Sequence, residues 1–241
     1  MSRRPRLYRL LRKALELSPL RWRLALWLKI AATCHLIEIE LRELEKLPAS
    51  GKVAVDIGAN FGSYSYVMAR HFDRVLAFEP NPQTTGWLTA AQLSNVEMIG
   101  TGLTSPDHVG SDELSVPVAD GVVMHGWGSL NFQSKLKYDH VNRYPVQLET
   151  LDSHQLTDVG MIKIDVEGHE AQVLKGAKET IQRCRPTLIV EVIDANLAEV
   201  DQWLNRLDYQ HCPPEALFSK AAIASTVQPN RVYLPSERSR R

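Results

Sequence analysis

The sequence predicts an α/β protein: a Rossmann-like, doubly wound and mostly parallel sheet flanked by helices, preceded by an N-terminal helical extension. Short apolar runs typical of buried strands alternate with segments of helical periodicity from residue 52 onward. The connections between them are short, and neighbouring parallel strands need a crossover that returns the chain to the same edge. The 241 residues, 44% of them hydrophobic, suffice for one substantial core.

The extension comes first along the chain. Apolar residues recur at three- and four-residue spacing over residues 5–46, which predicts two helices broken near Ser18 and Pro19. Proline and glycine within residues 48–51 mark the start of the main domain. We therefore divide the chain into a basic helical extension over residues 1–48 and one domain over residues 49–241.

The elements of the main domain then alternate. The expected strands are short and rich in Val, Ile and Leu; in chain order they cover residues 52–57, 74–79, 95–100, 159–168, 187–192 and 230–235. The expected helices lie between them and cover residues 61–70, 82–93, 170–183 and 197–207. Glycine, proline and polar residues interrupt the rhythm over residues 101–150, where we expect loops with short strands at 113–118 and 144–149.

The even charge balance hides an asymmetry. The chain has 28 basic and 28 acidic residues, yet residues 1–30 contain nine of the basic residues and, of the acidic ones, Glu16 alone. The first thirty residues therefore carry a net charge of +8 and the remainder −8. An acidic main domain repels phosphate, so we expect no nucleic-acid partner.

Cysteine usage and the apolar runs favour a cytoplasmic protein. Three cysteines without CxxC spacing argue against a disulfide framework or a zinc site. The apolar run over residues 24–32 is too short to span a bilayer, and no signal-like cleavage site follows it.

The basic extension, with Trp22 and Trp27, either lies on an anionic inner membrane surface or packs as a cap or homo-oligomer contact. Amphipathicity alone leaves both open.

A glycine turn follows the first expected strand. Asp56, Gly58, Asn60 and Gly62 lie at its carboxyl end, where ligands bind in open α/β sheets. The spacing differs from the GxGxxG of dinucleotide sites, and Asp56 would repel a diphosphate. It suits a cationic ligand such as S-adenosylmethionine, whose ammonium Asp56 would bind directly or through water. Alternatively, the glycines form a tight turn and Asp56 caps the next helix.

A second acid strengthens the cofactor interpretation. Glu79 ends the second expected strand, 21 residues after Gly58. An acid at about this offset binds ribose hydroxyls in nucleotide-binding folds. Asp56 and Glu79 would then contact the two polar ends of S-adenosylmethionine.

Five fragments in order resemble the FkbM family of S-adenosylmethionine-dependent methyltransferases. They are VDIGANFGSYS (55–65), VLAFEPNP (75–82), LETLD (148–152), MIKIDVEGHEAQVLKGA (161–177) and LIVEV (188–192). The resemblance covers roughly residues 51–192 and implies that the domain over residues 49–241 is a methyltransferase domain of this family, which usually methylates a hydroxyl oxygen. By position, it places Asp56, Gly58, Asn60 and Gly62 at the methionine end of the cofactor, Glu79 at the ribose and Asp165 at the transfer site.

Candidates for the proton transfer lie on the fourth and fifth strands. Lys163 and Asp165 point to one side by the two-residue period, and Glu167 follows in the turn. Asp165 and Glu191, on neighbouring strand ends, would hold a divalent cation such as magnesium that lowers the pKa of the acceptor. Alternatively, Glu191 forms a buried ion pair with Lys163, and Glu167 caps the following helix.

Two histidines are further candidates for the base. His125 lies in the irregular region, where a substrate loop is expected, and competes with a merely exposed side chain. His169 opens a helix, which favours a structural role.

The expected function is S-adenosylmethionine-dependent O-methylation of a sugar, glycan or natural product. The rivals are a dinucleotide-dependent oxidoreductase and a catalytically silent scaffold of the same fold.

Overall fold

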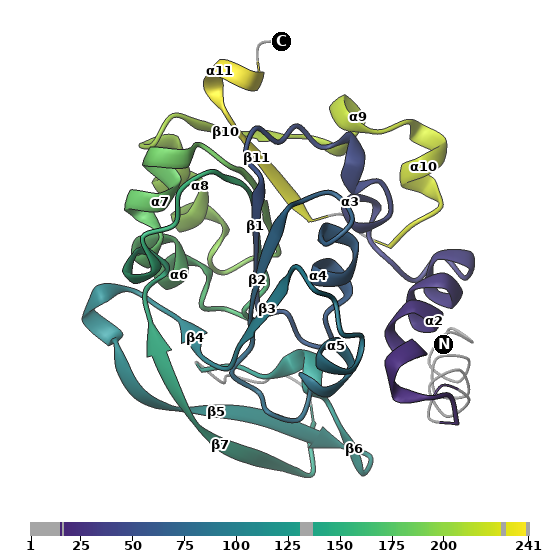
Figure 1. The fold of residues 1–241 in the computed structure, drawn as a ribbon. Coiled ribbons are helices and arrows are strands. Elements are labelled where there is room, and N and C mark those ends of the chain that lie inside the picture. The colour runs from purple at the N-terminus through teal and green to yellow at the C-terminus, as the bar shows by residue number, and fades with distance from the viewer. Residues whose placement is uncertain (1–14, 16, 131–136, 228–229, 240–241) are drawn as a thin grey trace.

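The structure, a computed structural model, describes residues 15, 17–130, 137–227 and 230–239. Its centre is a seven-stranded sheet with the order β10-β11-β9-β8-β1-β2-β3 (Figure 1). The bounds are β1 (Val53–Ile57), β2 (Arg74–Phe78), β3 (Val96–Ile99), β8 (Val159–Ile164), β9 (Thr187–Val190), β10 (Tyr209–Cys212) and β11 (Arg231–Pro235). β11 runs antiparallel to both β9 and β10, and the other described pairs are parallel. The expected doubly wound, mostly parallel sheet is confirmed.

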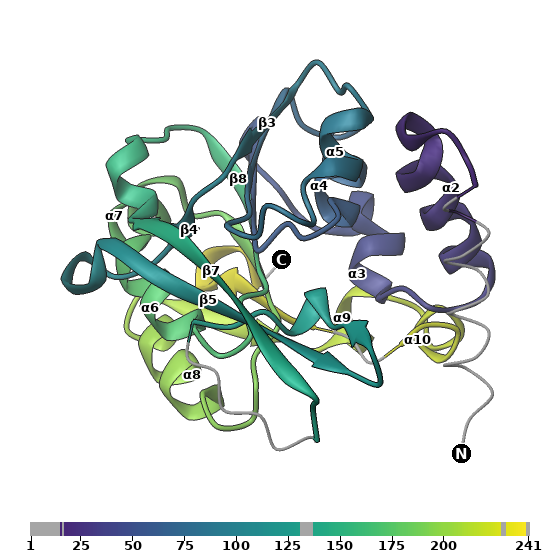
Figure 2. The same cartoon turned by 90° about the horizontal axis from the view of Figure 1, so that it is seen from below.

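Helices cover both faces of this sheet (Figures 1 and 2). On one face lie α6 (Glu170–Gly176), α7 (Lys178–Cys184) and α8 (Leu197–Asn205). On the other lie α4 (Ser63–Met68) and α5 (Gly86–Ala90), with α2 (Leu20–Thr33) outside them. The short remaining helices are α3 (Ile39–Arg42), α9 (Pro214–Leu217), α10 (Lys220–Ala224), α11 (Ser236–Ser239) and the 3-10 turns η1 (Leu44–Lys46), η2 (Pro106–His108), η3 (His125–Trp127) and η4 (Leu151–His154).

Alternation along the buried strands divides the core in two. Ala54 belongs to the cluster on the α4 side, whereas its neighbour Val55 belongs to the cluster on the α6 side. Successive side chains of a strand point to opposite faces, so a sheet covered on both sides needs apolar residues at every position. Leu24 and Leu28 of α2 join the first cluster, so the extension contributes to the core of the main sheet.

A second sheet packs below the first, with the order β4-β7-β5-β6 (Figure 1). It consists of β4 (Gly102–Leu103), β5 (Gly110–Ala119), β6 (Val122–Val123) and β7 (His140–Glu149). The long antiparallel pair of β5 and β7 contains both short strands expected within residues 101–150. The sequence predicted these strands, but not that they form a sheet of their own.

Two expectations about helices need correction. The helix expected to run to residue 46 ends at Thr33, and α3 and η1 follow as separate turns. The first expected helix of the extension lies almost wholly outside the described residues. The helix expected over 170–183 divides into α6 and α7 at Ala177, directly after Gly176, where an added Cβ would lie 1.9 Å from the carbonyl oxygen of Thr104. β10 was not expected.

Candidate cofactor pocket and carboxylate cluster

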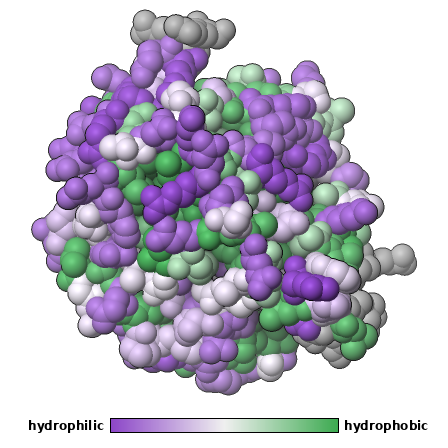
Figure 3. Space-filling view, in the orientation of Figure 1, coloured by the Kyte–Doolittle hydropathy of each residue, from purple (hydrophilic) through white to green (hydrophobic). Residues whose placement is uncertain are grey.

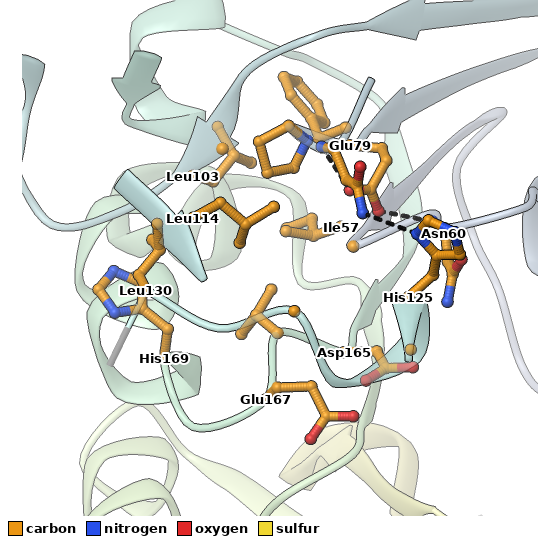
Figure 4. Close-up of a pocket in the computed structure, with 18 residues that line it drawn as sticks. Ile57, Asn60, Glu79, Leu103, Leu114, His125, Leu130, Asp165, Glu167 and His169 are labelled. Carbon is orange, nitrogen blue, oxygen red and sulfur yellow. Dashed lines mark hydrogen bonds between the residues drawn. The ribbon is translucent and has the colours of Figure 1, made fainter. Parts of the chain in front are cut away.

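A pocket opens between the carboxyl ends of β1, β2 and β8 and the second sheet (Figure 4). Its polar lining consists of Asn60, Glu79, Asn81, His125, Asp165, Glu167 and His169. Its apolar lining includes Ile57, Phe78, Leu103, Leu114, Leu130 and Val166. From β1 the chain continues to β2 and β3 on one side, whereas β8 and β9 lie on the other side. The strand order therefore reverses beside β1, and such a switch point is where α/β sheets bind ligands.

The two glycines of the first turn make room for protein neighbours. Gly58 has φ +78, and an added Cβ would lie 1.8 Å from the carbonyl oxygen of Asp165. Gly62 has φ +92, and an added Cβ would lie 2.7 Å from Leu88 of α5. A side chain at either position would be strained and would clash. Of the two glycines, Gly58 lines the pocket and Gly62 does not.

Asp56 lies behind the turn and does not line the pocket. Its side chain is 2% exposed, and its Oδ2 accepts hydrogen bonds from the backbone N–H of Ser65 at 2.8 Å and the Ser65 hydroxyl at 2.6 Å. Ser65 lies in the first turn of α4, whose N–H groups have no partner within the helix. Burial raises the pKa of Asp56 to about 6, although the bonds from Ser65 act against this shift.

This geometry gives Asp56 the helix-end role that the sequence left as an alternative. Asp56 belongs to β1, and it binds the first turn of α4 from that strand without occupying the N-cap position of the helix. Its contact with the ammonium of a ligand stays a prediction.

Glu79 lies at the expected place, at the end of β2 and in the pocket wall. Its Oε2 accepts a hydrogen bond from the backbone N–H of Asn60, and its Oε1 accepts one from that of Asn81, both at 2.7 Å. These bonds fix the carboxylate, while each oxygen keeps a lone pair for a ligand. Burial raises the pKa of Glu79 to about 7, and the two N–H bonds oppose this shift.

Asn60 carries an unsatisfied acceptor. Its Oδ1 is buried and has no hydrogen-bond partner among the described residues. The residue has φ 50 and lines the pocket. A buried amide oxygen without a partner is costly, so this atom favours a ligand that donates a hydrogen bond.

Lys163 and Asp165 are close, but only Asp165 lines the pocket. The Lys163 side chain is 1% exposed, and its Nζ lies 3.6 Å from Asp165 Oδ2 and 3.9 Å from Glu191 Oε2. Asp165 and Glu191 approach each other as expected, with the Lys163 ammonium beside both, but the Glu191 side chain is 51% exposed and the pair is not buried as in the ion-pair alternative. Burial, followed by the charge of Asp165, raises the pKa of Glu191 to about 7.

The structure gives no support to the magnesium ion expected at Asp165 and Glu191. Lys163 already supplies the positive charge beside both carboxylates. Within the described part of the chain, no group of three or more His, Cys, Asp and Glu side chains is arranged to hold a metal ion.

Glu167 lies in the turn after β8 and lines the pocket, with its side chain at the lower margin of the site in Figure 4. Burial, together with the charges of Asp165 and Glu191, raises its pKa to about 8. The turn is instead closed by Glu170, whose Oε1 accepts a hydrogen bond from the backbone N–H of Gly168 at 2.7 Å. The alternative that Glu167 caps the helix is wrong, because no side chain caps α6 at its N-cap residue, His169.

Both candidate histidines line the pocket. His125 Nδ1 lies 3.4 Å from the side-chain amide of Asn81, and its ring packs edge-on against Phe61. His169 is 5% exposed, with its Nε2 2.9 Å from the Thr104 hydroxyl, and burial lowers its pKa. A neutral, hydrogen-bonded His169 fits the structural role that the sequence favoured.

Sequence reasoning missed Asn81 and the leucines of the second sheet. Asn81 is 1% exposed and lies between Glu79 and His125, within the EPNP fragment that follows β2. Leu103 and Leu114 reach the pocket from β4 and β5. Their apolar runs were visible in the sequence, but their position over the pocket depends on how the two sheets pack.

The described lining is acidic. It contains three carboxylates, from Glu79, Asp165 and Glu167, and no lysine or arginine. A diphosphate would find no lysine or arginine here, whereas a cation would favour ionisation of Glu79 and Glu167, whose pKa values lie at about 7 and 8.

Comparisons with known proteins point to one family. A family model described as the methyltransferase FkbM domain matches residues 56–211. The hexuronic acid methyltransferase AglP of Haloferax volcanii is 30% identical over 161 residues, which are 65% of this chain and 61% of that protein. The chain thus spans less than two thirds of the length of this curated relative.

Solved structures are more distant. The crystal structure of a methyltransferase FkbM from Methylobacillus flagellatus has 18% identity and a TM-score of 0.49, covering 90% of this chain and 55% of that one. That of a SAM-dependent methyltransferase from Aquifex aeolicus has 14% identity and a TM-score of 0.39, covering 76% of this chain and 85% of that one.

Proposed function

Because the chain belongs to the FkbM methyltransferase family, we propose that it is an S-adenosylmethionine-dependent O-methyltransferase whose acceptor is a hydroxyl group of a sugar or glycan. The sugar is supported by the relative described as a hexuronic acid methyltransferase. A natural product that carries a sugar-like hydroxyl belongs to the same acceptor class.

The acidic, partly unsatisfied lining of the pocket is the observation that carries the proposal. Asn60 Oδ1 is a buried acceptor without a described partner, and Glu79 is held by two N–H groups with lone pairs to spare. A ligand with an ammonium and ribose hydroxyls supplies donors to both. A dinucleotide would instead bring a diphosphate among three carboxylates.

These residues fit S-adenosylmethionine, and each has a part. Asn60 would receive the ammonium and Glu79 the ribose hydroxyls. Leu103, Leu114 and Leu130 give an apolar wall suited to a purine ring. The bound cofactor supplies a methyl group already activated by a positively charged sulfur.

The chain must then orient the acceptor and accept its proton. As the oxygen–carbon bond forms and the carbon–sulfur bond breaks, the hydroxyl proton passes to a base. Glu167 suits this task because it lines the pocket and its pKa, about 8, lies near physiological pH. Asp165 and His125 line the same pocket and are the competing candidates, whereas Lys163 and Glu191 act through Asp165 as positioning residues.

The proposal is tested by transfer of an isotope-labelled methyl group from S-adenosylmethionine to a panel of neutral sugars, uronic acids and oligosaccharides. Label in a methyl ether of at least one sugar supports the proposal, and its loss in Asp165→Asn and Glu167→Gln variants locates the site. Cofactor binding without transfer to any member of the panel would contradict the sugar acceptor. Transfer to nitrogen or carbon acceptors would contradict O-methylation.

A further inference from the structure

Exposed apolar side chains gather at the start of α2. Leu17 is 90% exposed, Leu20 44%, Trp22 55% and Leu26 40%. These are four of the eight large hydrophobic side chains that are exposed in the described part of the chain, and they lie within ten residues. The other four, Val109, Trp127, Tyr138 and Ile193, lie in separate segments.

The two faces of α2 differ in what covers them. Leu24, Leu28 and Ala31 are buried against the core of the main sheet. On the opposite side, Trp22 and Leu26 are one helical turn apart and both exposed. A helix that merely caps a domain has a polar outer face, so this face is apolar beyond what packing requires.

Basic residues surround this outer face. Arg21 and Lys29 are exposed, and the guanidinium of Arg21 lies 4.8 Å above the ring of Trp22. No acidic residue lies in α2, and residues 1–30 carry a net charge of +8 against −8 for the rest. Green, apolar surface appears in Figure 3 at the right of the molecule, where α2 lies in Figure 1.

We propose that the outer face of α2 docks on a bilayer that contains anionic phospholipids. Trp22 and Leu26 enter the boundary between headgroups and acyl chains, while Arg21 and Lys29 contact lipid phosphates. The charge asymmetry orients the molecule, since the same membrane attracts the extension and repels the acidic domain. None of the described helices is long and apolar enough to cross a membrane, and surface docking requires none. This proposal does not depend on the proposed function.

Sedimentation of the full chain with vesicles tests the proposal. Vesicles of phosphatidylcholine with phosphatidylglycerol should bind the protein, and those of phosphatidylcholine alone should bind it far more weakly. The Trp22→Ser/Leu26→Ser double variant should lower the partition coefficient at least about tenfold, as expected when two exposed apolar side chains are lost. Salt should weaken binding of the original chain, because exposed charges are screened.

A matched control is Val109→Ser/Ile193→Ser, which removes exposed apolar side chains elsewhere and should leave vesicle binding unchanged. Equal binding by the Trp22/Leu26 variant and the original chain would overturn the proposal. The proposal would also be overturned if the original chain bound no vesicles but formed a dimer in light scattering that the Trp22/Leu26 substitutions dissociated. The outer face of α2 would then contact a second copy of the chain.

Discussion

The carboxylate of Glu79 accepts a 2.7 Å hydrogen bond from the backbone N–H of Asn60. This bond joins the end of β2 to the turn after β1, the two segments that would hold opposite ends of the cofactor. The turn is thereby set by the same residue that would bind the ribose. Binding and local order should therefore be lost together when Glu79 is removed.

Asp56→Ala should lower stability, because the backbone N–H and the hydroxyl of Ser65 both lose the carboxylate that accepts their hydrogen bonds. The expected loss is about 1–3 kcal/mol in the free energy of unfolding, measured in urea without ligand. Asp73→Ala is the control, since the Asp73 side chain is 75% exposed. Unchanged stability would refute the helix-end role. Weaker binding of S-adenosylhomocysteine by the folded variant would support the contact with the ammonium.

The pH dependence of the methyl transfer rate should report Glu167. Glu167 can accept the hydroxyl proton only in its ionised, carboxylate form. The value of kcat should therefore rise with pH and level off above about 8, the pKa of Glu167. Glu167→Gln should lower kcat about 100-fold, the lower range of general base catalysis, and remove this limb. A Glu167→Gln variant that retains the original profile would transfer the role to Asp165 or His125.

Lys163→Met should disturb the carboxylates beside the pocket. Asp165 and Glu191 would lose the ammonium that lies 3.6 and 3.9 Å from them. The expected loss of unfolding free energy is about 1–3 kcal/mol, less than for a fully buried pair because both carboxylates are partly exposed. Adding Glu191→Gln should restore part of it, and the double-mutant cycle measures the coupling. Additive effects in that cycle would contradict a shared ion-pair cluster.

Glu40 should make stability depend on pH. It lies in α3 and is 0% exposed, and its carboxylate oxygens make no well-formed hydrogen bond among the described residues, although the backbone N–H groups of Glu40 and Asn230 act to lower its pKa. Burial raises its pKa to about 7 from 4.5. The folded protein then binds the proton more tightly than the unfolded chain, so this stabilisation is complete below pH 4.5 and is lost as pH rises to about 7.

Glu40→Gln should therefore raise the free energy of unfolding at pH 8 by about 2–3 kcal/mol and leave little difference at pH 4.5. Denaturant titrations at the two pH values measure this. The exposed Glu45→Gln is the control. A variant less stable than the original at pH 8 would show that the carboxylate has a stabilising partner.

The sequence predicted the main sheet well because its strands are buried on both faces and read as continuous apolar runs. β1, β2, β8 and β9 all lie within their expected ranges. The sequence did not predict β10, because only Tyr209 of its four residues is buried and the strand lacks an apolar run. The close approach of Gly176 to the carbonyl oxygen of Thr104, which is distant in the chain, is likewise not encoded in local periodicity.

The candidate site was predictable in position but not in partners. Glu79, Asp165 and His125 reach the pocket, as the strand ends and the irregular region suggested. The sequence placed Asp56 at the cofactor together with Glu79 and Asp165, whereas the structure turns Asp56 towards Ser65 and leaves Glu79, Asp165 and Glu167 in the lining. Which carboxylate faces a ligand depends on side-chain partners across the sheet.

Calorimetric titration of the same protein with S-adenosylhomocysteine and with NADH tests the central claim most directly. The acidic pocket predicts that S-adenosylhomocysteine binds more than tenfold tighter, a difference of at least about 1.4 kcal/mol. Glu79→Ala should weaken it at least tenfold, whereas Glu97→Ala, on the exposed face of β3, should not. Equal or tighter binding of NADH would contradict the account.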